Sequence, residues 1–167
     1  MSAFKRRHFL VLGAAATLAA CSTSRVPVLP KPASSPETLS DEEILAAINA
    51  TRRANGAPPW TYNTQLEQAA RSHARQMASR DTLSHDLGTT LRERVTAAGY
   101  QGAVGENVAK GYTSLPAAIE GWLASPGHRS TLLSQRFTEF GLAAARTGSG
   151  KVYWAMIAGG SFQAWMQ

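Results

Sequence analysis

The sequence predicts an α+β domain in which helices cover an antiparallel sheet. Two observations lead to this class. Apolar residues recur at helical spacing from residue 40 into the middle of the chain, whereas the last third holds short apolar runs divided by glycine-rich turns. Helices followed by a group of strands are typical of layered α+β domains. The 167 residues, 44% of them hydrophobic, suffice for one such domain and leave little room for a second.

The first 20 residues have the layout of an export signal. Lys5, Arg6 and Arg7 precede an uncharged apolar run, residues 9–20, that ends in small residues. This run is shorter than the roughly 20 residues of a transmembrane helix, so we expect it to be removed. Residues 6–10 also resemble the core of a twin-arginine signal. Paired arginines are ordinary in Sec signals too, so the export route stays open between the two.

Cys21 predicts a lipid anchor. Residues 18–21, Leu-Ala-Ala-Cys, resemble a bacterial lipobox, whose cysteine is acylated and becomes the first residue of the mature chain. Because it is the only cysteine, it excludes an internal disulfide and any multi-thiolate zinc site. Residues 22–39 contain four of the eight prolines, with serines between them and no apolar periodicity. We therefore expect a tether over 21–39 and a folded domain over 40–167, anchored to a membrane of the cell envelope.

The formal charge of +6 does not predict a nucleic-acid partner. Without the signal, 14 basic and 11 acidic side chains remain. The remaining arginines, among them Arg52, Arg71 and Arg75, alternate with acids, as at residues 92–94. We interpret them as lying on solvated helix faces. No Lys/Arg stripe interleaved with aromatic residues is present, so we expect no nucleic acid to bind.

Five helices are expected in the first part of the domain. Ser40 and Glu43 form a capping-box pattern, which predicts a helix from Ser40 to about Asn55. A second helix over 64–80 has one apolar side, and His73 on that side is interpreted as a packed residue rather than a ligand. Shorter helices are predicted at 90–98 and 114–123, and a further one, containing His128, begins at residues 125–126.

The last third predicts strands at 140–146, 151–157 and 161–165, joined by turns at 147–150 and 159–160. The large aromatic side chains are interpreted as core or sheet-face residues. A lipid-binding groove lined by some of them is the alternative. These residues are Trp122, Tyr153, Trp154 and Trp165.

The chain offers few side chains for chemistry: three histidines after the signal, and Glu106 in a glycine-flanked setting. Motifs of zinc proteases, serine hydrolases, phosphate-binding loops and paired cysteines are absent from the sequence. Two imidazoles and one carboxylate can form an open zinc site. However, His85, Glu106 and His128 are 21 and 22 residues apart, and such spacing does not show that they meet. Glu106 could instead brace a loop through backbone amides, and this structural role is compatible with a role in a shared site.

Four motifs in order make the chain resemble the bacterial branch of the CAP superfamily, the cysteine-rich secretory, antigen 5 and pathogenesis-related 1 proteins, also called SCP domains. The resemblance covers residues 40–165, and Arg52 and residues 48–49 fit the family's opening helices. Each motif is weak alone, and their order makes the resemblance specific. The motifs are Leu-Ser-His at 83–85, Gly-Glu-Asn-Val-Ala at 105–109, Trp122, and Ser-Pro-Gly-His-Arg at 125–129.

The resemblance implies a three-layer α-β-α sandwich with a mainly antiparallel sheet and a cleft where two histidines and acidic residues converge. By position, His85, Glu106 and His128 are the cleft residues. Asn107, Ser125 and Arg129 are expected to support them. Many members have a second cleft glutamate where this chain has Ser125, and asparagine is common where it has Thr131. These departures leave a complete two-histidine, two-glutamate metal site in doubt.

The leading functional interpretation is a lipid-anchored envelope protein that binds a lipid, glycan or peptide in this cleft, with neither catalysis nor a cofactor required. The competing interpretation is a zinc-dependent hydrolase in which His85, Glu106 and His128 hold the metal and polarise a water molecule. A third is a purely structural surface domain, which needs only the fold and the anchor.

Overall fold

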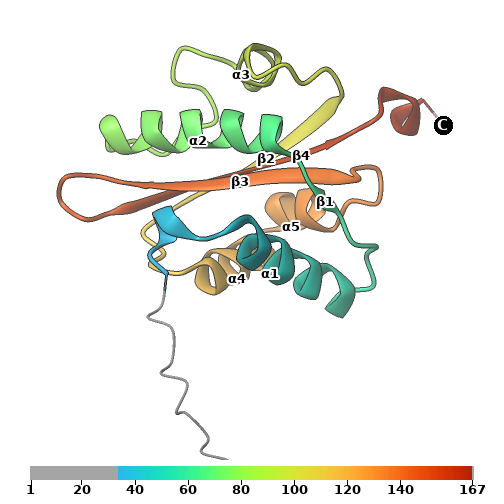
Figure 1. Cartoon of the computed structure of the whole chain (residues 1–167), viewed down its shortest axis with the longest axis horizontal. Helices are drawn as coiled ribbons and strands as arrows, with labels where there is room; N and C mark the ends of the chain where they lie inside the picture. Colours follow the sequence, from blue (N-terminus) through green and yellow to red (C-terminus); the bar gives the residue numbers. More distant parts are fainter. Residues whose placement is uncertain (1–33, 167) are drawn as a thin grey trace, which may run out of the picture. The chain divides into compact units, whose positions relative to one another are not determined.

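A computed structural model describes residues 34–166 of the chain (Figure 1). The described elements belong to one compact unit, residues 33–167. The predicted signal peptide, Cys21 and most of the tether lie outside the described residues. In chain order the elements are η1 (Pro36–Thr38), α1 (Asp41–Ala54), β1 (Thr61–Tyr62), α2 (Thr64–Ser79), α3 (Leu91–Ala97), β2 (Ala103–Lys110), α4 (Leu115–Ala124), α5 (Pro126–Leu133), β3 (Glu139–Arg146), β4 (Val152–Gly160) and η2 (Phe162–Trp165).

The fold is a three-layer sandwich, as the resemblance implies. The four strands form one sheet in the order β1-β3-β4-β2. Strands β2 and β3 each pair antiparallel with β4, and only the two-residue β1 is parallel to its neighbour, so the mainly antiparallel sheet is confirmed. Helices α2 and α3 cover one face of the sheet, and α1, α4 and α5 cover the other (Figure 1). Strand β2 forms one edge.

Side-chain caps set the helix starts close to where the sequence places them. Ser40 and Glu43 make both bonds of the predicted capping box at α1, and Thr90 and Glu93 make another at α3. Ser114 caps α4 through the N–H of residue 117. The break between α4 and α5 falls at Ser125, followed by a proline at the first position of α5.

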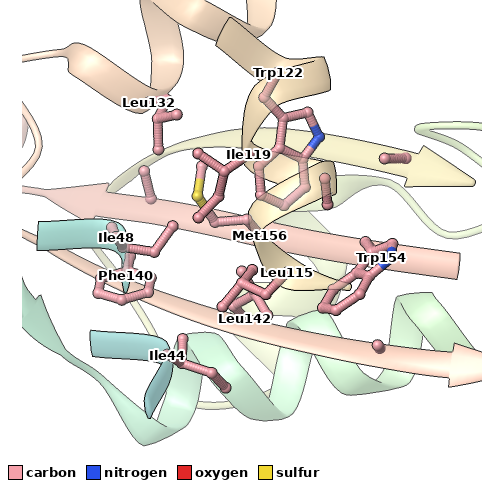
Figure 2. Close-up of a cluster of buried hydrophobic side chains, with 14 of the residues drawn as sticks. Ile44, Ile48, Leu115, Ile119, Trp122, Leu132, Phe140, Leu142, Trp154 and Met156 are labelled. Carbon is pink, nitrogen blue, oxygen red and sulfur yellow. The ribbon is translucent and has the colours of Figure 1, made fainter. Parts of the chain in front are cut away.

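Two hydrophobic cores hold the layers together, one on each face of the sheet. The first lies between the sheet and helices α1, α4 and α5 (Figure 2). Figure 2 shows Trp122, Phe140 and Met156 within this cluster. The second lies between the sheet and helices α2 and α3 and includes Leu66 and Tyr153. Trp122, Tyr153 and Trp154 are fully buried, which confirms that they are core aromatics.

The structure corrects three expectations about the elements. Residues 103–110 form the edge strand β2, so Glu106 does not lie in a loop. Residues 162–165 form a 3-10 turn rather than a strand, because the Ser161 hydroxyl accepts the N–H of residue 163 and closes the backbone locally. Trp165 is 44% exposed there and is not a core residue. Ahead of α1, Glu37 of η1 forms an ion pair with Arg146 of β3 at 2.6 Å.

Arg52 corrects the interpretation of the arginines as solvated. It is fully buried in α1, and its guanidinium donates to the carbonyl groups of Pro58, Leu132 and Ser134. It follows Ile44 and Ile48 at intervals of four residues, so it lies on the helix face that packs against the core. Burial lowers the pKa of Arg52 to about 10. Across residues 34–166, the helices are too short or too polar to cross a bilayer.

Candidate functional site

The sheet edge at β2 carries a buried carboxylate paired with an exposed histidine. Glu106 Oε2 accepts the Nδ1–H of His85 at 2.9 Å, and Glu106 Oε1 accepts a guanidinium N–H of Arg94 at 2.8 Å. The side chains of Glu106 and Arg94 are 2% and 3% exposed, whereas that of His85 is 60% exposed. Both oxygens of the carboxylate thus accept hydrogen bonds, and one of them holds an exposed imidazole.

Three different elements bring these side chains together. Alternation along β2 turns Glu106, with Val108, toward the layer of α2 and α3. Arg94 comes from α3, and His85 comes from the loop between α2 and α3. Arg94 also donates to the carbonyl of His85 at 3.1 Å and to that of Thr89, so one guanidinium fixes both the loop and the carboxylate.

His73 lies behind this pair, inside the second core. Its side chain is fully buried, and its Nε2 donates to the carbonyl of Ser84 at 2.8 Å, next to His85. Its Nδ1 is buried without a hydrogen-bond partner among the described residues, which suits a neutral imidazole. Burial lowers the pKa of His73 below the usual histidine value, against the opposing effect of Glu106. The prediction that His73 packs within its helix agrees with this burial.

His128 approaches the same edge from the opposite layer. It occupies the first turn of α5, and its ring centroid lies 6.4 Å from that of His85. The buried side chain of Asn107 donates to the His128 carbonyl at 2.8 Å and ties the start of α5 to β2. Because neighbouring residues of β2 face opposite layers, Glu106 and Asn107 hold one histidine each.

The environments shift the two histidines in opposite directions. The hydrogen bond that His85 donates to Glu106 is the largest cause that raises the pKa of His85. Burial, followed by the charge of His85, lowers the pKa of His128. His85 therefore holds its proton to a higher pH than His128 does.

A groove of about 290 Å³ opens beside His128 along the edge of β2. Its walls combine apolar and aromatic surface with a few polar groups, which is typical of ligand sites. Ser125, which the sequence predicted to support the cleft residues, lines this groove. The lining residues are Leu83, Val108, Ala109, Lys110, Tyr112, Gly121, Trp122, Ser125 and His128.

Two expected roles do not fit the geometry. Arg129 donates to the side chain of Asn55 at 2.9 Å, at the end of α1, so it does not support the two histidines. The predicted zinc ligands do not form a three-residue set either. Glu106 already binds His85 and Arg94, and no group of three His, Cys, Asp or Glu side chains suited to a metal occurs within residues 34–166.

Arg94 is the site residue that the sequence interpretation missed. It lies three residues after Leu91 and four before Ala98, which places it on the same stripe of the helix as these two residues. Val95 is buried, and Leu91 and Ala98 pack against the second core, so this spacing was the available signal that Arg94 points inward.

Comparisons with known proteins agree with the fold. Residues 45–158 match the model of CAP, the cysteine-rich secretory protein family. YlbC, an uncharacterised membrane protein of Bacillus subtilis, is 32% identical over 114 residues, covering 66% of this chain and 33% of YlbC. YkwD, an uncharacterised protein of the same organism, is 28% identical over 122 residues, covering 70% of this chain and 47% of YkwD. The chain thus matches between a third and about half of each of these relatives.

Solved structures show the same architecture. An extracellular protein from Bacillus anthracis that contains an SCP domain aligns with a TM-score of 0.63 at 28% identity, covering 72% of this chain and 40% of that chain. An outer surface protein from Borrelia burgdorferi aligns with a TM-score of 0.64 at 22% identity, covering 72% of this chain and 91% of that chain. The second likeness concerns the fold alone.

Proposed function

The chain belongs to the CAP, or cysteine-rich secretory protein, family, and from this premise we propose that it is a membrane-anchored binding protein of the bacterial envelope. Its ligand, a lipid, glycan or peptide, occupies the groove beside His128. The anchor is the lipidated Cys21 predicted from the sequence. An extracytoplasmic location is supported by the predicted export signal and by relatives described as membrane and extracellular proteins.

One observation carries the proposal: a buried ion pair is used to hold an exposed imidazole. Burying Glu106 and Arg94 costs desolvation energy, and apolar residues of similar volume often stabilise a fold better than a buried pair does. In return, the buried pair orients the exposed imidazole of His85, whose ring centroid lies 6.4 Å from that of His128. An oriented donor beside a groove is a binding feature that packing alone does not require.

Direct binding measurements on the unit 33–167 test this proposal, since both cores lie within it. We would titrate the ¹⁵N-labelled unit with palmitate, chitotriose and a short peptide, and follow its amide resonances. At least one class is expected to shift Leu83, Ser125 and His128, with affinity reduced about tenfold or more in the double variant His85→Ala/His128→Ala. The matched control is Arg129→Ala, which removes the side chain that follows His128 in sequence and bonds to Asn55 at the end of α1. No response to any of the three classes would contradict the proposal.

A zinc-dependent hydrolase fits the donor set less well. A catalytic zinc site usually has three protein ligands and an open position, and this edge offers two imidazoles. Glu106 instead accepts a bond from His85, the arrangement by which a carboxylate orients a metal-binding histidine. We therefore derive no hydrolytic step. Metal analysis of the wild type, His85→Ala and His128→Ala is expected to show no stoichiometric zinc, and zinc lost in both variants would favour the hydrolase.

A further inference from the structure

The turn after β4 presents an exposed apolar patch that lies apart from the groove. The patch consists of Phe162, Trp165 and Met166, which are 52%, 44% and 77% exposed. They belong to η2 and the residue that follows it, beyond the end of β4 (Figure 1). The other large apolar side chains that are exposed among residues 34–166, Leu83 and Tyr112, line the groove. The patch is therefore a second apolar surface of the domain.

Contacts with the domain hold the patch in place. The ring of Trp165 packs against the ring of Phe137, with 5.2 Å between the centroids, and Phe137 belongs to the first core. The Ser161 hydroxyl accepts the N–H of residue 163 at 3.1 Å and closes the turn. Apolar side chains gain free energy by leaving water, so a cluster of them exposed on a folded domain marks an interaction surface.

Two arginines flank the patch. The guanidinium carbon of Arg136 lies 4.8 Å from the ring centroid of Trp165, and that of Arg92 lies 5.5 Å from the ring centroid of Phe162. Both arginines are exposed, and neither forms an ion pair within the part of the chain that the structure describes. The sequence has no acidic residue after position 139. Glu93, next to Arg92, is used in the capping box of α3.

We infer that this patch binds the surface of a bilayer that contains anionic lipids. This inference rests on the membrane anchor of the proposed function, because an anchored domain stays close to its bilayer, and it adds a contact outside the groove. Aromatic and apolar side chains beside basic ones are typical of segments that lie in the membrane interface. The indole of Trp165 enters the region between headgroups and acyl chains, and the guanidinium groups meet lipid phosphates.

The charges favour a bilayer over a second copy of this chain. In a two-fold dimer the same patch faces itself, so Arg92 and Arg136 of both copies would meet without an acidic partner. Like charges brought together in this way oppose association. An anionic bilayer supplies the missing negative charge and the apolar phase to the same surface.

Contact through the patch alone is expected to be weak and reversible. The patch has three apolar side chains on a single turn, and even one acyl chain gives only marginal membrane binding. A chain without its lipid anchor is therefore still released from membranes during fractionation. In the anchored protein, the patch orients the domain on the bilayer rather than retaining it there.

The fluorescence of Trp165 gives a direct test. The other three tryptophans, Trp60, Trp122 and Trp154, are at most 2% exposed, so vesicles act mainly on the emission of Trp165. We would titrate the unit 33–167, which contains both cores and lacks Cys21, with vesicles of equal parts phosphatidylcholine and phosphatidylglycerol. The emission is expected to shift to shorter wavelength as the indole leaves water. Vesicles of phosphatidylcholine alone should bind more weakly.

Apolar variants test the patch itself. Phe162→Ser/Met166→Ser keeps the Trp165 probe and should weaken binding to the mixed vesicles at least about tenfold, because two apolar side chains no longer enter the interface. Both positions are exposed, so the fold should be preserved. Unchanged binding of this variant, or no binding of the wild type to mixed vesicles, would overturn the inference.

Charge-matched variants test the arginines. Arg92→Gln/Arg136→Gln should weaken binding to the mixed vesicles at least about tenfold. Arg53→Gln/Arg75→Gln removes the same net charge from exposed positions of α1 and α2 and should change binding by less than about threefold. Equal losses in the two variants would show an effect of net charge alone and would contradict a contact at the patch.

The outcomes for the patch and for the proposed function are separable. Vesicle binding is measured on a unit without Cys21, so it does not depend on lipidation. Ligand binding in the groove is read from Leu83, Ser125 and His128, which lie outside the patch. Vesicle binding that fails while a groove ligand binds would defeat this inference and leave the proposed function standing. Vesicle binding without any groove ligand would do the reverse.

Discussion

The Nδ1 of His85 lies 2.9 Å from Oε2 of Glu106, although the histidine side chain is 60% exposed and the carboxylate is 2% exposed. The carboxylate is fixed from behind by Arg94, so it orients the imidazole rather than following it. The pair therefore links the buried side of β2 to the protein surface, and the charge of His85 contributes, after burial, to lowering the pKa of His128.

The first prediction concerns the pKa of His85. Glu106→Gln removes the negative charge that favours the protonated imidazole, so the pKa of His85 should fall toward or below the ordinary histidine value. Titration of the histidine ring resonances by NMR measures this change. Glu42→Gln, an exposed substitution on α1, serves as the control and should leave the titration unchanged. An unaltered pKa of His85 in Glu106→Gln would contradict the assigned pairing.

The same pair makes stability depend on pH. The folded pKa of His85 is raised above its unfolded value, so its contribution is fully present below about pH 6.5 and is lost as the pH rises through the folded pKa. The difference in unfolding free energy between wild type and His85→Ala should shrink over that interval. Urea denaturation at a series of pH values measures it, and a difference that grows with pH would have the wrong sign.

Arg94→Met is expected to destabilise the fold by about 3–5 kcal/mol, because it leaves the carboxylate of Glu106 buried without its cation. The double variant Arg94→Met/Glu106→Leu should recover much of this loss, since neither charge is then buried. Arg75→Met, on the exposed face of α2, is the matched control and should change stability by less than about 0.5 kcal/mol. Denaturant unfolding gives all three values. Equal stability of the single and double variants would argue against a buried charge as the cause.

Gly141→Ala tests the contact between α2 and β3. A Cβ at Gly141 would collide with the backbone nitrogen of Glu67, and backbone atoms cannot move aside as a flexible side chain can. We expect a loss of about 3 kcal/mol or more, seen as a lower thermal midpoint. Gly148→Ala adds a methyl group where no atom lies within 4 Å and should be nearly neutral. Similar midpoints for both variants would contradict the close approach.

The membrane anchor is tested at Cys21. Cys21→Ser removes the thiol that the lipobox motif predicts to be acylated, so the protein should move from the membrane fraction to the soluble fraction. Fractionation with immunoblotting measures the distribution, and mass spectrometry of the wild-type amino terminus identifies the lipid. Retention of Cys21→Ser in the membrane fraction would contradict the anchor.

The sequence by itself predicted the α+β class, the five helices and the two long strands β3 and β4. These features depend on local information: the periodicity of apolar residues, the caps at Ser40 and Thr90, and glycine-rich turns. The sequence of residues 103–110 shows none of these local signals for a strand. A glycine, an acid and an amide interrupt their apolar pattern, and pairing with β4, which lies far along the chain, makes them a strand.

For the site, a family resemblance in the ordered motifs indicated His85, Glu106 and His128. Their spacings of 21 and 22 residues do not show how far apart the side chains lie in the fold. Only the tertiary structure decided how they act. Glu106 and Asn107 lie on opposite faces of one edge strand, so that each holds one histidine. Arg94 is buried beside Glu106 and donates a hydrogen bond to its carboxylate. Local sequence patterns determine helices, caps and turns because these form between near neighbours. Long-range packing determines which charges are buried together, and therefore what the site is able to bind.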